Sequence, residues 1–207
     1  MPIKRSLIRH SSLLSLLLLL GACAQEQQPA GTPPQAAPNI VLFLADDAGY
    51  ADFGFQLEGR EDLAQLTPHI DSIAHDGAQF TSFYMAASVC SPSRAGMLTG
   101  RYPQRFGHER NIPPNYMQGG LPLEEQLLPE LLGAAGYTSA CVGKWHLGYP
   151  PAYHPLERGF NHFDGFLAGS RSYLPLRRAS SSHAFQVDGE ATPEQGYITD
   201  RIGRHAV

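Results

Sequence analysis

The stretch NIVLFLADD, residues 39–47, joins a largely apolar run to two adjacent carboxylates. A continuous run rich in strand-forming residues is typical of a strand that is covered on both faces in a parallel sheet. We therefore predict a buried strand over residues 39–45 that ends at Asp46 and Asp47. This strand and its polar end are the starting point for the rest of the fold.

Further along the chain, helix and strand patterns alternate. Thr67 followed by Pro68 indicates a helix start, Gly77 and Gly100 indicate helix ends, and Cys90 or Ser91 is expected to cap the helix before Gly100. The alternation predicts an α/β layered fold. The expected elements are strands at 78–86 and 137–142 and helices at 68–76, 91–99, 129–135 and 193–206. Because a crossover helix normally leads into another strand, we expect the sequence to be an incomplete part of the domain.

The first residues have the pattern of a targeting segment. Lys4, Arg5 and Arg9 precede the apolar run 13–20, which is shorter than the roughly 20 residues that a spanning helix needs. Leu20-Gly21-Ala22-Cys23 resembles a lipoprotein cleavage box, and an ordinary signal peptide is the alternative. The sequence thus predicts a signal peptide over 1–22 and an exported protein, either periplasmic or held by a lipid anchor on the bacterial envelope.

Composition defines the remaining organisation. Residues 23–38 are rich in Pro, Ala and Gln and predict a tether, so the folded domain is expected over 39–207. The net charge of -4 and the scattered basic residues exclude a nucleic-acid partner, and only a lipid anchor would bring a membrane into contact. If Cys23 is used in processing, Cys90 and Cys141 remain for a disulfide, although Cys141 also fits a small buried hydrophobic residue.

Three expected strand ends carry polar residues, and ligands in open α/β sheets bind at such ends. Asp46 and Asp47 together suit a hard cation such as Ca²⁺ or Mg²⁺, but such a pair also commonly caps a loop or a helix. We expect the three ends, which bring the Asp pair, Cys90 and the segment GKWH, to converge on one site.

Cys90 precedes a helix whose free N–H groups favour an anion, and Arg94 lies one turn further along. Two alternatives to an anion site remain. Cys90 could be a buried cysteine beside a surface arginine, or it could be a thiolate nucleophile that His146 activates. By the alternation of an extended chain, Lys144 and His146 are expected on one side and Trp145 on the other. A solvent-reaching lysine and a hydrogen-bonded structural histidine would explain the same residues without a site.

Two segments resemble the signatures of one enzyme family. CSPSRAGMLTGR at 90–101 resembles the C-x-P-S-R motif of type I sulfatases, which are formylglycine-dependent hydrolases of the alkaline phosphatase superfamily, and GYTSACVGKWH at 136–146 is similar to the second signature of that family. The similarity extends from about Pro38 to the end of the sequence. It implies part of an alkaline-phosphatase-like sandwich with a mainly parallel central sheet.

The resemblance also implies roles for individual residues. Cys90 would be oxidised to Cα-formylglycine (3-oxoalanine) by a formylglycine-generating or sulfatase-maturing enzyme, and one hydroxyl of its hydrate would attack the sulfur of a sulfate ester. Asp46, Asp47 and the residue made from Cys90 would bind Ca²⁺ in preference to Mg²⁺. Arg94 would hold the formylglycine, while Lys144 and His146 would contact the hydrate and the sulfate, with His146 as the base.

The resemblance leaves other possibilities open. Rival functions are a phosphatase or phosphodiesterase of the same superfamily and a silent binding protein in which Cys90 stays a thiol. The family's later metal and sulfate ligands are not identifiable in the sequence, so the 207-residue piece alone is expected to be poorly active or inactive. The substrate is either a sulfated carbohydrate or a small sulfate ester, with Arg171, Arg177 and Arg178 as contacts to an anionic sugar or as a solvated loop. The remaining histidines are expected on loops or the surface: His154, His162, His183 and His205.

Overall fold

The computed structural model describes residues 37–56 and 66–207. The expected signal peptide over 1–22 and most of the expected tether over 23–38 lie outside the described residues. The chain divides into two units, one that ends at Leu44 and one that begins at Ala45. Among the helices of the described residues, none has the length and apolar character to cross a membrane.

The two strands expected at 39–45 and 78–86 are absent from the described part of the chain. Residues 37–44 have no regular secondary structure, and the side chains of Val41 and Phe43 are exposed. In the second segment, Phe80, Phe83 and Tyr84 are likewise exposed. A preference for strand structure expresses packing against neighbouring strands, and neither run is paired with a strand within the described residues. These two predictions are wrong.

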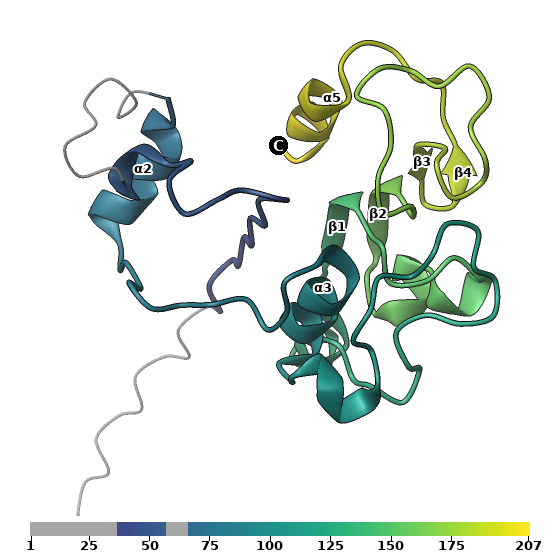
Figure 1. Ribbon diagram of the computed structural model, residues 1–207, viewed down its shortest axis with the longest axis horizontal. Coiled ribbons are helices and arrows are strands. Elements are labelled where there is room, and N and C mark those ends of the chain that lie inside the picture. Colours follow the sequence, from purple (N-terminus) through teal and green to yellow (C-terminus); the bar gives the residue numbers. More distant parts are fainter. Residues whose placement is uncertain (1–36, 57–65) are drawn as a thin grey trace, which may run out of the picture. The chain divides into compact units, whose positions relative to one another are not determined.

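The sheet of the second unit is mixed. β1 (Ala140–Lys144) runs parallel to β2 (His162–Phe166), with Ala140 opposite His162. β3 (Gln186–Val187) and β4 (Glu190–Ala191) continue the sheet in the order β1-β2-β3-β4, and both of their pairings are antiparallel (Figure 1). The α/β class is therefore confirmed, while the sheet of the described residues has only one parallel pairing.

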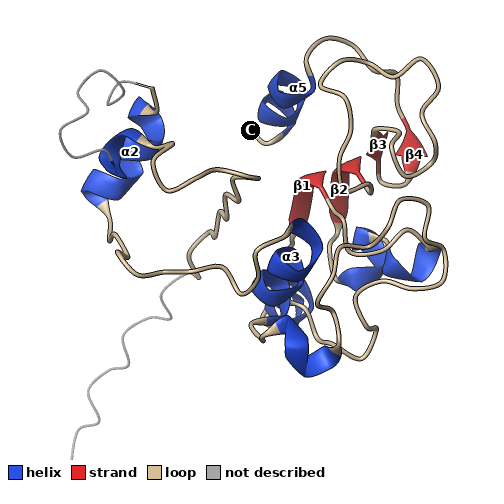
Figure 2. Cartoon of the chain, viewed as in Figure 1, coloured by secondary structure: helices blue, strands red, loops and turns tan. Residues whose placement is uncertain are grey.

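The expected helices are present, although the last one begins at residue 198 rather than 193 (Figure 2). They are α2 (Pro68–Asp76), α3 (Cys90–Thr99), α4 (Leu128–Ala134) and α5 (Ile198–His205). Gly100 ends α3 in the left-handed region with φ of 65°. The residue before α3 is Val89, so neither Cys90 nor Ser91 is the cap. Short 3-10 turns complete the described secondary structure: η1 (Gly54–Gln56), η2 (Pro103–Phe106), η3 (Pro151–Tyr153) and η4 (Pro155–Arg158).

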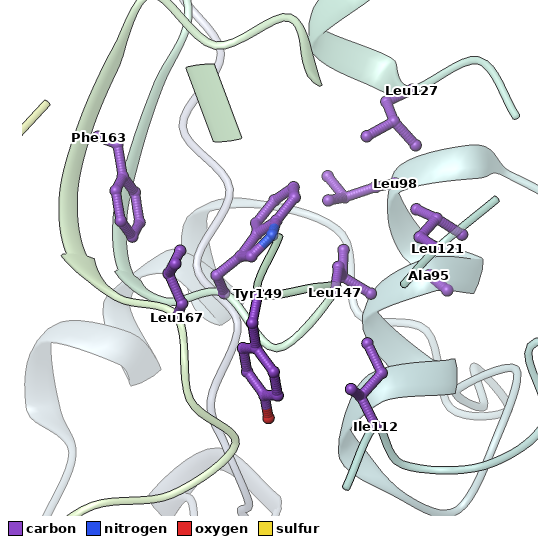
Figure 3. Packing of buried hydrophobic residues seen from close by; sticks show 10 residues of the cluster. Ala95, Leu98, Ile112, Leu121, Leu127, Leu147, Tyr149, Phe163 and Leu167 are labelled. Carbon is purple, nitrogen blue, oxygen red and sulfur yellow. The ribbon is translucent and has the colours of Figure 1, made fainter. Parts of the chain in front are cut away.

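The main core forms where α3, the residues between α3 and α4 and the segment after β1 pack together against β2 (Figure 3). Trp145 is its largest buried side chain, and the indole N–H donates to the carbonyl of Tyr153 at 2.8 Å. The guanidinium of Arg158 is also buried, and it donates to the backbone carbonyls of Leu121 and Glu125. The largest polar groups inside this core are therefore hydrogen-bonded, as burial requires.

A second, smaller cluster supports the segment between β2 and α5. Phe185 is buried there, and the guanidinium of Arg201 lies 3.8 Å above its ring. Glu194 accepts hydrogen bonds from Arg171 and from the backbone N–H groups of Leu176 and Phe185. Burial by itself would raise the pKa of Glu194, but these hydrogen bonds outweigh it and lower the pKa to about 2.

We predict that Phe163→Ala lowers the free energy of unfolding by about 3–5 kcal/mol, because Phe163 is fully buried and the change leaves a cavity. Phe80→Ala is the matched control, since Phe80 is 76% exposed, and it should change that free energy by no more than about 0.5 kcal/mol. Urea unfolding of the two variants measures both values. Equal losses would contradict the assignment of Phe163 to the core.

We also predict that the difference in the free energy of unfolding between the wild type and Glu194→Gln depends on pH. A carboxyl whose pKa is lowered by folding stabilises the folded state above its unfolded pKa, and the stabilisation disappears as pH falls through the folded pKa. The stability difference between the wild type and Glu194→Gln should therefore be constant from pH 7 to about 5 and should shrink as pH falls from about 4.5 toward 2. Unfolding curves of both proteins across this range measure it, and a difference that grows on acidification would contradict it.

Candidate active site

Cys90 is the first residue of α3, and the first turn of this helix is fixed by its surroundings. The backbone N–H of Ser91 donates to the side-chain carbonyl of Asn111 at 2.9 Å, and Pro92 needs no partner there because it has no N–H. Arg94 lies four residues after Cys90, so both side chains project from the same side of the helix.

The carboxylate of Asp46 joins three of the expected site residues. Its Oδ2 accepts from the guanidinium of Arg94 and from the ammonium of Lys144, each at 2.7 Å. Its Oδ1 lies 4.0 Å from the sulfur of Cys90. The structure thus brings together residues that are up to 98 positions apart in the sequence: Asp46, Cys90, Arg94 and Lys144.

Asp46 is held as an anion. Burial by itself would raise the pKa of Asp46, but the hydrogen bonds and positive charges of Lys144 and Arg94 outweigh it and keep the pKa below its ordinary value. Arg94 also donates to the carbonyl oxygen of Lys144 at 2.5 Å, which links α3 to the end of β1. Two cations and one carboxylate beside Cys90 leave a net positive charge, and this arrangement favours a tetrahedral oxyanion.

Asp47 does not join this cluster, and no complete metal site is formed by the described residues. The side chain of Asp47 is exposed and makes no hydrogen bond or ion pair with any described residue. No group of three or more His, Cys, Asp or Glu side chains suited to a metal ion occurs in residues 37–56 and 66–207.

Cys90 and Cys141 are both free thiols, and burial raises the pKa of Cys141 to about 12. The disulfide considered from the sequence is therefore not formed.

The backbone conformation of His146 differs from the extended chain that the sequence-based prediction assumed. Its φ of 59° interrupts the extended chain, so its side-chain direction cannot be inferred from that of Lys144. Its Nε2 lies 3.1 Å from the carbonyl of Ile112, which can only accept, so Nε2 carries the proton. Burial and the nearby charges of Lys144 and Arg94 lower the pKa of His146 to about 4, although the Ile112 carbonyl and Asp46 act in the opposite direction.

The neutral ring of His146 therefore has a bare nitrogen. Nδ1 is buried and has no hydrogen-bond partner within the described residues. The ring also packs against the backbone at Gly169, where an added Cβ would collide with it. The result is an acceptor whose position is fixed by the surrounding backbone.

Three supporting residues were not identified from the sequence. The hydroxyl of Ser91 donates to the carbonyl of His146 at 2.7 Å and lies 2.7 Å from Nε2 of His108, while Asn111 holds the Ser91 N–H. These contacts couple the start of α3 to the backbone of His146. A hollow of about 370 Å³ borders this network and is lined by residues 107–113, Tyr116 and Gly120. The free N–H groups of a helix start indicate that some acceptor is needed, but they do not identify Asn111.

Several other polar residues considered from the sequence have structural partners. Arg171 forms an ion pair with Glu194 at 2.5 Å and is therefore not available to a ligand, whereas Arg177 and Arg178 are exposed. The four histidines expected on loops or the surface lie there: His162 beside Asp188, His183 beside Ser180, His154 between η3 and η4, and His205 exposed on α5. His154 packs edge-on against Phe163, and His205 pairs with the buried carboxyl of Asp164.

Comparisons with known proteins agree on one family. The family model described as Sulfatase matches residues 38–179. The chain is 48% identical over 160 residues to N-acetylgalactosamine-6-sulfatase of Mus musculus and 47% identical over 128 residues to arylsulfatase G of Homo sapiens. These alignments cover 74% and 62% of this chain but only 29% and 23% of the relatives.

Solved structures show the same similarity. The crystal structure of Ps i-CgsB matches with a TM-score of 0.74 and 37% identity, covering 81% of this chain and 40% of that protein. Its complex with k-i-k-neocarrahexaose matches with a TM-score of 0.70 and 35% identity, covering 77% of this chain and 38% of that protein. The chain therefore spans less than half the length of the proteins that it resembles.

We predict that Asp46→Asn lowers the free energy of unfolding by roughly 1–3 kcal/mol, because it removes the anion between two half-buried cations. Asp47→Asn is the matched control, and it should have an effect within about 0.5 kcal/mol, since Asp47 is exposed. Urea unfolding at pH 7 compares the two. A larger loss for the Asp47 variant would show that the bridging role of Asp46 is wrong.

Proposed function

The chain belongs to the sulfatase family, and from this premise we propose that the protein hydrolyses sulfate esters. The single observation that carries the proposal is the cluster around Asp46, in which the Cys90 sulfur lies 4.0 Å from a carboxylate that also binds Arg94 and Lys144. A reactive group made from Cys90 would stand beside two cations. These are the groups that a transferring sulfuryl group, with its negatively charged oxygens, requires.

Cys90 is the proposed site of conversion to formylglycine. A maturing enzyme that oxidises the thiol-bearing carbon to an aldehyde would act on the segment 90–94, whose cysteine, proline and arginine match the family motif. The hydrated aldehyde would supply a nucleophilic hydroxyl and a second hydroxyl for release of sulfate. The side chain of Cys90 is half-buried rather than enclosed, so its reactive carbon remains open to a substrate.

Calcium is the proposed metal, and the donors that are present fit it in kind. Oxygen is the ligand that Ca²⁺ prefers, and Asp46 has Oδ1 free of nitrogen partners while Oδ2 is bound by Arg94 and Lys144. Asp47 could supply a second carboxylate. Ca²⁺ takes six to eight oxygens, so further ligands would be needed beyond the two carboxylates and Cys90. When bound, the cation would lower the pKa of a neighbouring hydroxyl and withdraw charge from the sulfate oxygens.

The remaining side chains have roles that follow from their contacts. Arg94 and Lys144 are fixed by Asp46 and by the backbone at Lys144, so they would orient an anionic substrate at little entropic cost. His146 is neutral above about pH 4 and presents Nδ1 as an acceptor. It would accept a hydrogen bond or a proton from a hydroxyl at Cys90 or from the substrate, which is the action of a base.

The proposed substrate class is a sulfated carbohydrate. Support comes from relatives, since one similar protein is named N-acetylgalactosamine-6-sulfatase and one similar structure is a complex with k-i-k-neocarrahexaose. We further propose that the protein is exported and acts in the periplasm or on the cell envelope. The basic and apolar pattern of residues 4–20 and the cysteine at position 23 support this location.

We predict that the protein isolated from its own host carries formylglycine at position 90. Mass spectrometry of the peptide that spans Cys90 should show a lower mass than the unmodified peptide and no alkylation by a thiol reagent. Cys141 is the internal control, because it lies outside the C-x-P-S-R segment, so its thiol should be alkylated after unfolding. If Cys90 is recovered only in the alkylated form, the sulfatase proposal fails and a silent binding protein is favoured.

A further inference from the structure

An exposed pair of aromatic rings lies where the loop after Gly169 meets the residue before α5. Tyr173 and Tyr197 stack with their centroids 5.2 Å apart and their planes 10° from parallel. Tyr173 is 62% exposed and Tyr197 is 44% exposed, so the outer face of each ring is open to a ligand. We refer to these two residues as the tyrosine platform.

The platform is held in place rather than carried on a free loop. Glu194 binds Arg171, which precedes Tyr173 in the sequence, and the backbone N–H of Leu176, which follows it. The backbone N–H of Ile198 donates to the carbonyl of Tyr173 at 2.9 Å, which ties the loop to the start of α5. Because the surroundings already fix the rings, a ligand that binds them would lose little to ordering of the protein.

The segment beside the platform is positively charged. Residues 170–178 contain Arg171, Arg177 and Arg178 and no acidic residue, although the whole chain has a net charge of -4. Glu194 neutralises Arg171. Arg177 and Arg178 are exposed, and neither forms an ion pair or hydrogen bond with another residue that the structure describes. Two guanidinium groups without a partner in the described residues therefore follow Tyr173 by four and five positions in the sequence.

The platform lies within reach of the candidate active site. Gly169 packs against the ring of His146, and Tyr173 is four residues further along the chain. A fully extended chain spans at most roughly 3.6 Å per residue, so Tyr173 lies no more than about 14 Å from Gly169. A substrate that extends beyond its reacting group could therefore contact both places.

We propose that Tyr173 and Tyr197, together with Arg177 and Arg178, form a binding site for the further units of a sulfated oligosaccharide whose reacting sulfate lies at Cys90. The site deepens the proposed function and rests on it. The apolar face of a pyranose ring packs on an aromatic ring, while sulfate groups pair with the planar guanidinium forks. The same combination does not favour a nucleic acid, because the chain as a whole is acidic.

Calorimetric titration of the 207-residue chain with a sulfated galactose hexasaccharide tests the site, with the desulfated hexasaccharide as the paired ligand. We expect the sulfated ligand to bind, and its affinity to fall about tenfold in Tyr173→Ala and about tenfold in the double variant Arg177→Gln with Arg178→Gln. Tyr173→Phe should retain most of the affinity, since stacking does not need the hydroxyl. Tyr102→Ala and Arg105→Gln, at exposed positions of the same residue types, are the controls and should bind as the wild type does.

Three results would overturn the site: unchanged affinity in both the Tyr173→Ala and the double arginine variant, equal binding of the desulfated ligand, or equal binding of anionic phospholipid vesicles. The arginine variant changes only exposed side chains, so its result does not depend on whether Tyr173→Ala folds. The test is separable from that of the proposed function. The titration measures binding at the platform, whereas mass spectrometry of the peptide that spans Cys90 measures conversion to formylglycine, so either result can fail while the other stands.

Discussion

The candidate site depends on one carboxylate that two cations share. Arg94 comes from α3 and Lys144 from the end of β1, and both donate to Oδ2 of Asp46. Without that anion the two positive groups would lie close together in a half-buried position, where their repulsion is poorly screened. The ion pairs therefore do more than add stability. They fix the distance between the helix that carries Cys90 and the strand that leads to His146.

The helices could be predicted from the sequence because their signals are local. Pro68 and Gly77 bound α2, and Gly100 in the left-handed region ends α3, as the sequence indicates. The strands depend on partners elsewhere in the chain, so the apolar run 39–45 could not be placed by composition alone. The hairpin between β3 and β4 has a local signal that was overlooked: Asp188-Gly189 form a two-residue turn with φ of 50° and 91°.

The residues of the candidate site could be named from the sequence, but not their arrangement. Motif spacing identifies Cys90, Arg94 and Lys144, whereas the bridge through Asp46 is a long-range contact that spacing does not contain. The expected direction of His146 relied on an extended backbone, and its positive φ removes that basis. His108 and Asn111 were missed for a related reason, since each acts on Ser91 from a loop that has no motif of its own.

Two of the arginine–carboxylate pairs in the described residues, Arg171–Glu194 and Arg94–Asp46, differ in charge balance, and the difference matches their proposed roles. Glu194 fully neutralises Arg171 and also binds two backbone N–H groups, so that centre holds a loop and leaves no charge for a ligand. Asp46 faces two cations, and the surplus positive charge is directed at the space beside Cys90. If Asp47 turns toward the same space, the four charges balance, and an anionic ester would gain little from the site alone. A divalent cation held by the two carboxylates would restore the positive field, which is the physical argument for the calcium that we propose.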